Sequence, residues 1–214
     1  MIKIKEILWI IFFSILLGAL LKLRSPISDL PVLIPLSILS LFVVISINII
    51  AKKLTARYLD SSIEVSPWSF KRFGLASKKY FKKPFPSGIL FPIISTIASL
   101  GYFIWLAVFE FEPSPLSSRV TKRHGMYRFS ELTEWHIGII AASGVVLNLL
   151  FAIIFYLLPF NLIEIAKLSI FFAVWNMVPL GNLDGSKILF GSRLLWYSLA
   201  LISLIFLLYA LLLV

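Results

Sequence analysis

Six long blocks without a charged residue dominate this sequence. They cover residues 7–21, 30–50, 89–109, 137–160, 168–183 and 194–214. A helix needs about 20 apolar residues to cross the hydrocarbon core of a bilayer, and most of these blocks reach or approach that length. We therefore expect an all-α polytopic membrane protein with five to six transmembrane helices, in which residues 1–214 form a single integral membrane domain.

Two polar segments separate the apolar blocks. The first, 51–88, is expected to be a basic cytoplasmic loop, because it is too short and too basic to bury a core of its own. Within it, the residues SSIEVSPWSFKRFG at 61–74 partly alternate between apolar and polar, which predicts a short membrane-associated strand. The second segment, 110–136, is expected to be a polar loop.

The formal net charge of the chain is +10. On a soluble protein such a charge suggests a nucleic-acid partner, but in membrane proteins Lys and Arg collect in cytoplasmic loops. We therefore expect membrane lipid as a partner and no nucleic acid, and a protein integral to the cell membrane with its N-terminus and basic loops in the cytoplasm. Cysteine is absent, which excludes disulfides and thiolate metal sites.

The block 89–109 contains Pro92 and Gly101 and admits two paths. It can span the membrane as a kinked helix, or it can enter and leave on one face as a re-entrant segment, which is tolerated where the backbone is buried in protein. If it spans, twelve basic residues lie on one face and eight on the other; if it is re-entrant, seventeen share one face and only Lys22, Arg24 and Lys167 lie opposite. The positive-inside rule favours the re-entrant path.

Asp184 follows a break in an apolar run, FFAVWNMVPLGNLDGSKILF at 171–190. Pro179 removes a backbone donor and disfavours helix just before it, and Gly181 and Gly185 permit unusual backbone angles. The helix should therefore open near 176–182 and present Asp184 where it resumes. A carboxylate within a membrane predicts a functional site, and the simpler alternative is a loop residue at the membrane interface.

The stretch NMVPLGNLDGSKI resembles the asparagine–proline–LDG motif of the site-2 protease family of intramembrane zinc metalloproteases, also described as peptidase M50. The resemblance implies that Asp184 stands at the position of a zinc ligand. It also implies that Asn176, Pro179 and Gly185 belong to the cleft that receives an extended substrate strand.

A second motif supports the resemblance. In AASGVVLNLLFAIIFYLL, Gly144 and Asn148 have the spacing of the glycine and asparagine on a helix of that family, with Val145 where proline is usual. Asn148 is therefore expected in the cleft as well. The resemblance covers roughly residues 40–200, although 60–136 match only loosely.

The chain departs from the family at the HExxH motif, whose histidines bind zinc and whose glutamate is the general base. The matching segment, VVISINIIAKKLTARYLD, places Asn48 and Lys52 at the histidine positions and Ile49 at the glutamate position. Asparagine is a poor zinc ligand, a protonated lysine is none, and isoleucine cannot accept a proton. We therefore expect no catalytic residue and no cofactor, with zinc only if the protein is active.

Two positions are open to Lys52. If the geometry of the family is kept, Lys52 lies near Asp184 and forms an ion pair where zinc would sit. Alternatively, Lys52 extends to the membrane interface with Lys53 and Arg57.

Three functions remain. The first is a site-2-protease-like membrane protein without proteolytic activity, a pseudoenzyme whose cleft binds transmembrane or extended peptide segments as a regulator or scaffold. The second is an active zinc metalloprotease with atypical ligands, for which His124 and His136 are the only histidines. The third is a small transporter component with Asp184 at its site. The missing HExxH weighs against the second and the family motifs against the third.

Overall fold

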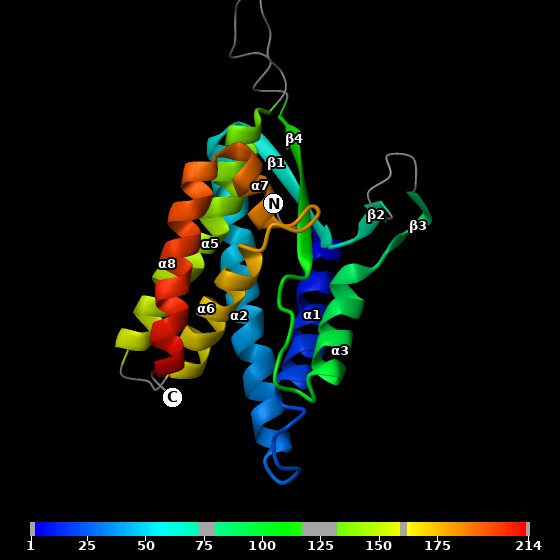
Figure 1. Ribbon diagram of the computed structural model, residues 1–214, viewed down its shortest axis with the longest axis vertical. Coiled ribbons are helices and arrows are strands. Elements are labelled where there is room, and N and C mark those ends of the chain that lie inside the picture. Colours follow the sequence, from blue (N-terminus) through cyan, green and yellow to red (C-terminus); the bar gives the residue numbers. More distant parts are fainter. Residues whose placement is uncertain (1–2, 73–79, 117–131, 159–161, 213–214) are drawn as a thin grey trace, which may run out of the picture.

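The computed structural model describes residues 3–72, 80–116, 132–158 and 162–212, with backbone only at 71–72 and 80–83. Helices make up most of this part of the chain, as the sequence predicts (Figure 1). They are α1 (Ile4–Leu21), α2 (Leu30–Tyr58), α3 (Ser87–Ala98), α5 (Glu134–Leu157), α6 (Ile163–Asn176), α7 (Asp184–Gly191) and α8 (Arg193–Leu212). The strands are β1 (Ser61–Pro67), β2 (Phe70–Arg72), β3 (Tyr80–Phe85) and β4 (Phe109–Pro115).

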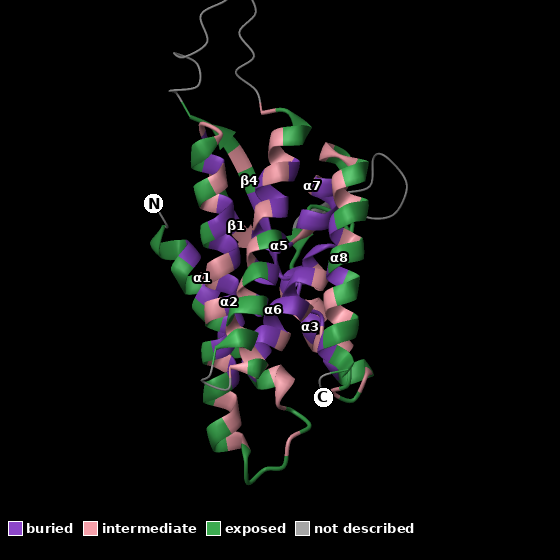
Figure 2. Ribbon diagram, turned by 90° about the vertical axis from the view of Figure 1, so that its left-hand side faces the viewer, coloured by how far each residue is buried: buried purple, intermediate pink, exposed green. Residues whose placement is uncertain are grey.

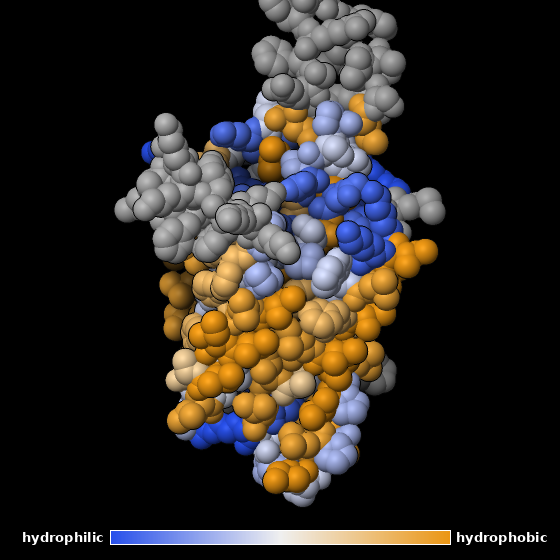
Figure 3. All heavy atoms as spheres, turned by 90° about the vertical axis from the view of Figure 1, so that its right-hand side faces the viewer, coloured by the Kyte–Doolittle hydropathy of each residue, from blue (hydrophilic) through white to orange (hydrophobic). Residues whose placement is uncertain are grey.

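Four of the described helices are long and apolar enough to cross a membrane. These are α1, α2, α5 and α8, with 18, 29, 24 and 20 residues. Their outer faces carry large exposed apolar side chains, and Figure 3 shows a broad hydrophobic band between hydrophilic ends of the molecule. Both features are compatible with a membrane location. Helices α3 and α6, with 12 and 14 residues, are shorter than a membrane span, so fewer helices reach that length than the apolar blocks suggest.

The block 89–109 turns back on itself. It begins as α3 and returns as an extended segment, 103–108, which leads into β4 (Figure 1). Both ends of this hairpin meet at Trp68: the Gly88 amide donates to the Trp68 carbonyl and the Trp68 amide donates to the Val108 carbonyl, each at 2.8 Å. This path is the one that the re-entrant interpretation predicts.

Two short antiparallel sheets lie in the polar segments. Strand β1 pairs with β4, with Val65 opposite Phe111, and β2 pairs with β3. The strand predicted within 61–74 is therefore confirmed. The segment 51–88 also contains the last two turns of α2, and 110–136 begins inside β4.

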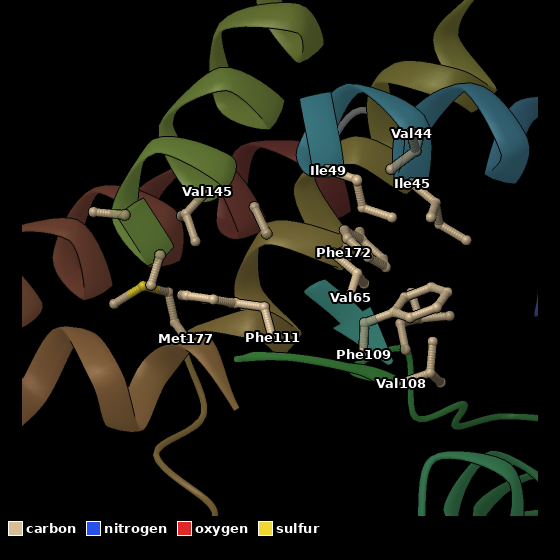
Figure 4. Close-up of a cluster of buried hydrophobic side chains, with 14 of the residues drawn as sticks. Val44, Ile45, Ile49, Val65, Val108, Phe109, Phe111, Val145, Phe172 and Met177 are labelled. Atoms are coloured by element: carbon tan, nitrogen blue, oxygen red, sulfur yellow. The ribbon is translucent and has the colours of Figure 1, made fainter. Parts of the chain in front are cut away.

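The main core forms where the β1–β4 sheet packs against α2, α5 and α6. Figure 4 shows Ile45 and Ile49 of α2 close to Val65, Phe109 and other side chains of the sheet. Buried residues concentrate on the inward faces of these helices, whereas α8 has only three buried residues (Figure 2). Ile49, at the family's glutamate position, is therefore a core residue.

Candidate functional site

The helix break at Asp184 is as predicted. Helix α6 ends at Asn176 and α7 begins at Asp184. Between them Gly181 has a φ of +54°, a left-handed conformation that favours glycine. The Asp184 side chain is fully buried in the first turn of α7, where the partial positive charge of the helix N-terminus stabilises a carboxylate. Asp184 is thus a buried helix residue and not an exposed loop residue.

Lys52 and Asp184 form a buried ion pair. The Lys52 Nζ lies 2.5 Å from Asp184 Oδ2, and the two side chains are 4% and 0% exposed. The ion pair expected from the family geometry is confirmed, and Lys52 does not extend outward. Its neighbour Lys53 instead binds the Glu6 carboxylate of α1 at 2.5 Å. The helix that carries Asn48 and Lys52 and the helix that begins at Asp184 therefore meet.

Gly144 brings α5 against this pair. A Cβ added at Gly144 would lie 2.6 Å from Lys52 Cε and 2.7 Å from Asn48 Nδ2, which is closer than real Cβ contacts. The glycine therefore leaves room for the Lys52 and Asn48 side chains, which an alanine would push aside. The structure thus brings Asn48, Lys52, Gly144 and Asp184 together, as the resemblance implies.

Three polar groups in this region are buried without a hydrogen-bond partner among the described residues. They are the amide nitrogen of Asn48, both amide atoms of Asn148, and the Oδ1 atom of Asp184. An unsatisfied buried polar group destabilises a protein by about 1–3 kcal/mol. The Asp184 region is therefore a cluster of buried polar groups, and packing of the surrounding apolar side chains does not account for their presence.

A second lysine, Lys187, lies beside the pair, and the sequence motifs do not single it out as a site residue. Its Nζ donates to the Phe111 carbonyl of β4 and sits 3.6 Å from the centre of the Phe111 ring. Burial lowers the pKa of Lys187 to about 8; Asp184 opposes the shift and Lys52 adds to it. Because Lys187 follows Asp184 by three residues in the sequence, helical spacing alone places both side chains on one face.

The three other predicted cleft residues are not part of the ion pair and have different surroundings from one another. Asn176 is buried, but its amide nitrogen donates to the Phe172 carbonyl one turn earlier in α6. Pro179 is exposed in the loop between α6 and α7. Gly185 is buried against the backbone of Met177, with no room for a side chain.

The donors around Asp184 do not fit a zinc ion. Zinc takes thiolate, imidazole and carboxylate ligands, whereas Lys52 offers an ammonium group without a lone pair and Asn48 an amide. Within the described ranges no three His, Cys, Asp or Glu side chains gather as metal ligands. His136 binds Thr133 at the start of α5, and His124 lies outside the described residues. This site holds a buried carboxylate paired with an ammonium group.

Gly185→Ala is expected to lower the free energy of unfolding by about 1–3 kcal/mol, the usual effect of overpacking. The added Cβ would lie 2.3 Å from the Met177 carbonyl oxygen, so α7 or the loop must move. Thermal unfolding followed by fluorescence of the six tryptophans measures the change. The neighbouring Ser186→Ala is the control and should change stability little. A Gly185→Ala protein as stable as the parent would contradict the close packing of α7 against the Met177 backbone.

Comparison of the chain with protein-family models, with curated proteins and with solved structures finds no match. The resemblance to the site-2 protease family therefore depends on the sequence motifs and on the meeting of α2, α5 and α7 at Asp184, and it stays a prediction.

Proposed function

We propose that this chain is an integral membrane protein of the site-2 protease type that lacks proteolytic activity. It uses its cleft to bind a transmembrane or extended peptide segment of another membrane protein, as a regulator or scaffold. The observation that carries the proposal is the buried Lys52–Asp184 ion pair, which puts an ammonium group where the resemblance expects zinc. Ile49, for which the resemblance implies the position of the general base, lies in the core and cannot accept a proton, and within the described ranges no metal-ligand set gathers.

The edge of β4 is the proposed site for an extended peptide. In an antiparallel pair, successive residues direct their backbone groups alternately toward and away from the partner strand. The Val65 amide of β1 donates outward to Glu6, so Phe111, which lies opposite Val65, also directs its backbone groups away from the pair. A strand edge without a partner strand, such as the outer edge of β4 in this two-stranded sheet, can accept an additional strand through main-chain hydrogen bonds. Here the Lys187 ammonium group donates a hydrogen bond to the outward carbonyl of Phe111, so an added strand would have to displace it.

A transmembrane segment has a separate place to bind. An apolar cavity of about 540 Å³ lies between the end of α1, the return segment of the α3 hairpin, α6 and α8. Phe103, Phe171, Trp175 and Leu207 are among its lining residues. Its size and lining suit the apolar side chains of a helix better than a polar solute. In the proposal the four long helices span the bilayer and the α3 hairpin is re-entrant.

The protease and transporter alternatives have less support. An active protease requires ligands that the described residues around Asp184 do not supply. A transporter site requires Asp184 to exchange partners, whereas this carboxylate is held by Lys52 inside the bundle. No described contact favours either alternative specifically.

Peptide binding tests the proposal. The probe is a fluorescein-labelled decapeptide of alternating Thr and Val, added to the purified chain in detergent and followed by fluorescence anisotropy. We expect saturable binding, and about tenfold tighter binding to Lys187→Met, because a hydrogen bond from a charged group contributes about 1.5–3 kcal/mol and the peptide no longer has to displace it.

Two controls identify the binding mode. A peptide with every second amide N-methylated cannot pair with a strand edge and should not bind. Arg193→Met removes the same charge from the exposed start of α8 and should leave the affinity unchanged. Equal binding of both peptides, or no effect of Lys187→Met, would exclude strand addition at β4.

A further inference from the structure

A second cavity lies at the end of the bundle opposite Asp184. It has a volume of about 320 Å³ and is lined by residues of α5, α6 and α8, close to the end of α5 at Leu157. The cavity exists because each of the three helices has a small side chain here: Ala152, Ala166 and Ala210. Together with Tyr156, Lys167 and Tyr209 they define what we call the Lys167 cavity. On α5, Ala152 lies about two helical turns beyond Gly144, which packs against Lys52.

Lys167 is the only charged residue that lines this cavity among the described residues. It is half-buried and has no hydrogen bond or ion pair with the described part of the chain. The nearest acid along α6, Glu164, is bound to Lys22 at 2.5 Å and lies one turn away. Residues 159–161, which connect α5 to α6, are Pro-Phe-Asn and contain no acid. Within the described ranges no carboxylate neutralises Lys167, so its ammonium group is available to an anionic ligand.

The inside of the cavity is apolar, and its polar groups come from Tyr156, Tyr209 and Lys167. The rings of Tyr156 and Tyr209 pack edge to face, 5.8 Å apart, and both residues lie in the last turn of their helices. Tyrosines and lysines at the ends of spanning helices are typical of the membrane–water interface, where the ring or stem is apolar and the tip is polar. A ligand that suits both parts has an acyl chain for the apolar lining and an anionic headgroup for Lys167.

We propose that the Lys167 cavity is a binding site for an anionic phospholipid of the membrane, with one acyl chain against the three alanines and the headgroup phosphate on Lys167. Charge complementarity selects this occupant, because a neutral lipid or an apolar helix would leave Lys167 half-buried without a counter-charge. The site is independent of the peptide-binding cleft, so either proposal can fail alone.

Native mass spectrometry of the purified chain tests the site, with phosphatidylglycerol and phosphatidylcholine of identical acyl chains added separately. We expect tighter binding of phosphatidylglycerol. Lys167→Gln should weaken that binding about fivefold, the equivalent of about 1 kcal/mol for one lysine near the membrane surface, and should leave phosphatidylcholine unchanged. Lys167→Arg should keep the preference, and Ala210→Phe, which fills the cavity, should reduce binding of both lipids.

Arg24→Gln is the matched control for a general effect of charge. It removes a positive charge from the same end of the molecule but outside the cavity, where Arg24 packs on Tyr102, and it should change nothing. Equal affinity for the two phospholipids, or equal effects of Lys167→Gln and Arg24→Gln, would overturn the proposal. Tighter binding of oleate than of phosphatidylglycerol, or a dimer mass lost in Ala210→Phe, would assign the cavity to a fatty acid or to a second copy instead.

Discussion

Lys52→Met is expected to lower the free energy of unfolding by about 3–5 kcal/mol, the usual effect of removing one partner of a buried ion pair. The change removes the only charge within 4 Å of the Asp184 carboxylate among the described residues and leaves that carboxylate fully buried. Methionine keeps most of the apolar stem of lysine, so packing against Gly144 is largely preserved. Thermal and denaturant unfolding in detergent, followed by tryptophan fluorescence, measure the loss.

Two further variants separate the charge effect from packing. Lys52→Met/Asp184→Asn removes both charges and should recover most of the lost stability, because no unpaired buried charge remains. Lys3→Met disrupts the exposed Lys3–Glu64 pair, whose side chains are 60% and 63% exposed, and should change stability by less than about 1 kcal/mol. If the double variant were as unstable as Lys52→Met, the loss would come from the lysine stem and not from the pair.

The sequence predicted the helices because apolar blocks of near-membrane length have few alternatives. Charge counting, which used residues outside the block, favoured a segment 89–109 that turns back, and α3 with its return segment has this shape. The helix ends were less accurate: the second block ends at residue 50, but α2 continues to Tyr58. The reason is that Lys52 and Lys53 each find a carboxylate inside the fold, on α7 and α1. Hydropathy alone cannot show such partners.

The site was predicted in part. The resemblance gave contact with Asp184 as one of two positions for Lys52, whereas periodicity alone leaves two residues 132 positions apart unrelated. The contact of Lys187 with Phe111 was not predicted, because it depends on β4. The alternation Phe109-Glu110-Phe111-Glu112 was a strand signal within the expected polar loop. Its partner β1 lies more than 40 residues earlier, and no local pattern gives that pairing.

Histidines introduced at positions 48 and 52 are expected to create a zinc site. In Asn48→His/Lys52→His the two side chains lie one turn apart on α2, and Asp184 is placed to complete two imidazoles and one carboxylate. We expect about one zinc ion per chain by elemental analysis after dialysis, against a substoichiometric amount in the parent. Zinc should also raise the unfolding temperature of the variant and not that of the parent, because it binds only the folded chain.

Asp184 decides whether the new ligands form the intended site. Adding Asp184→Asn to the two histidines should abolish both the bound zinc and the thermal shift, because an amide replaces the carboxylate ligand. If zinc stayed bound without Asp184, the histidines would bind metal elsewhere and the family geometry would lose its support. If the parent chain itself held stoichiometric zinc, a metalloprotease would replace the pseudoenzyme as the proposed function. A variant that unfolds normally but binds no zinc would mean that α2 and α7 meet at an angle unsuited to a metal, so that the ion pair does not mark a former zinc site.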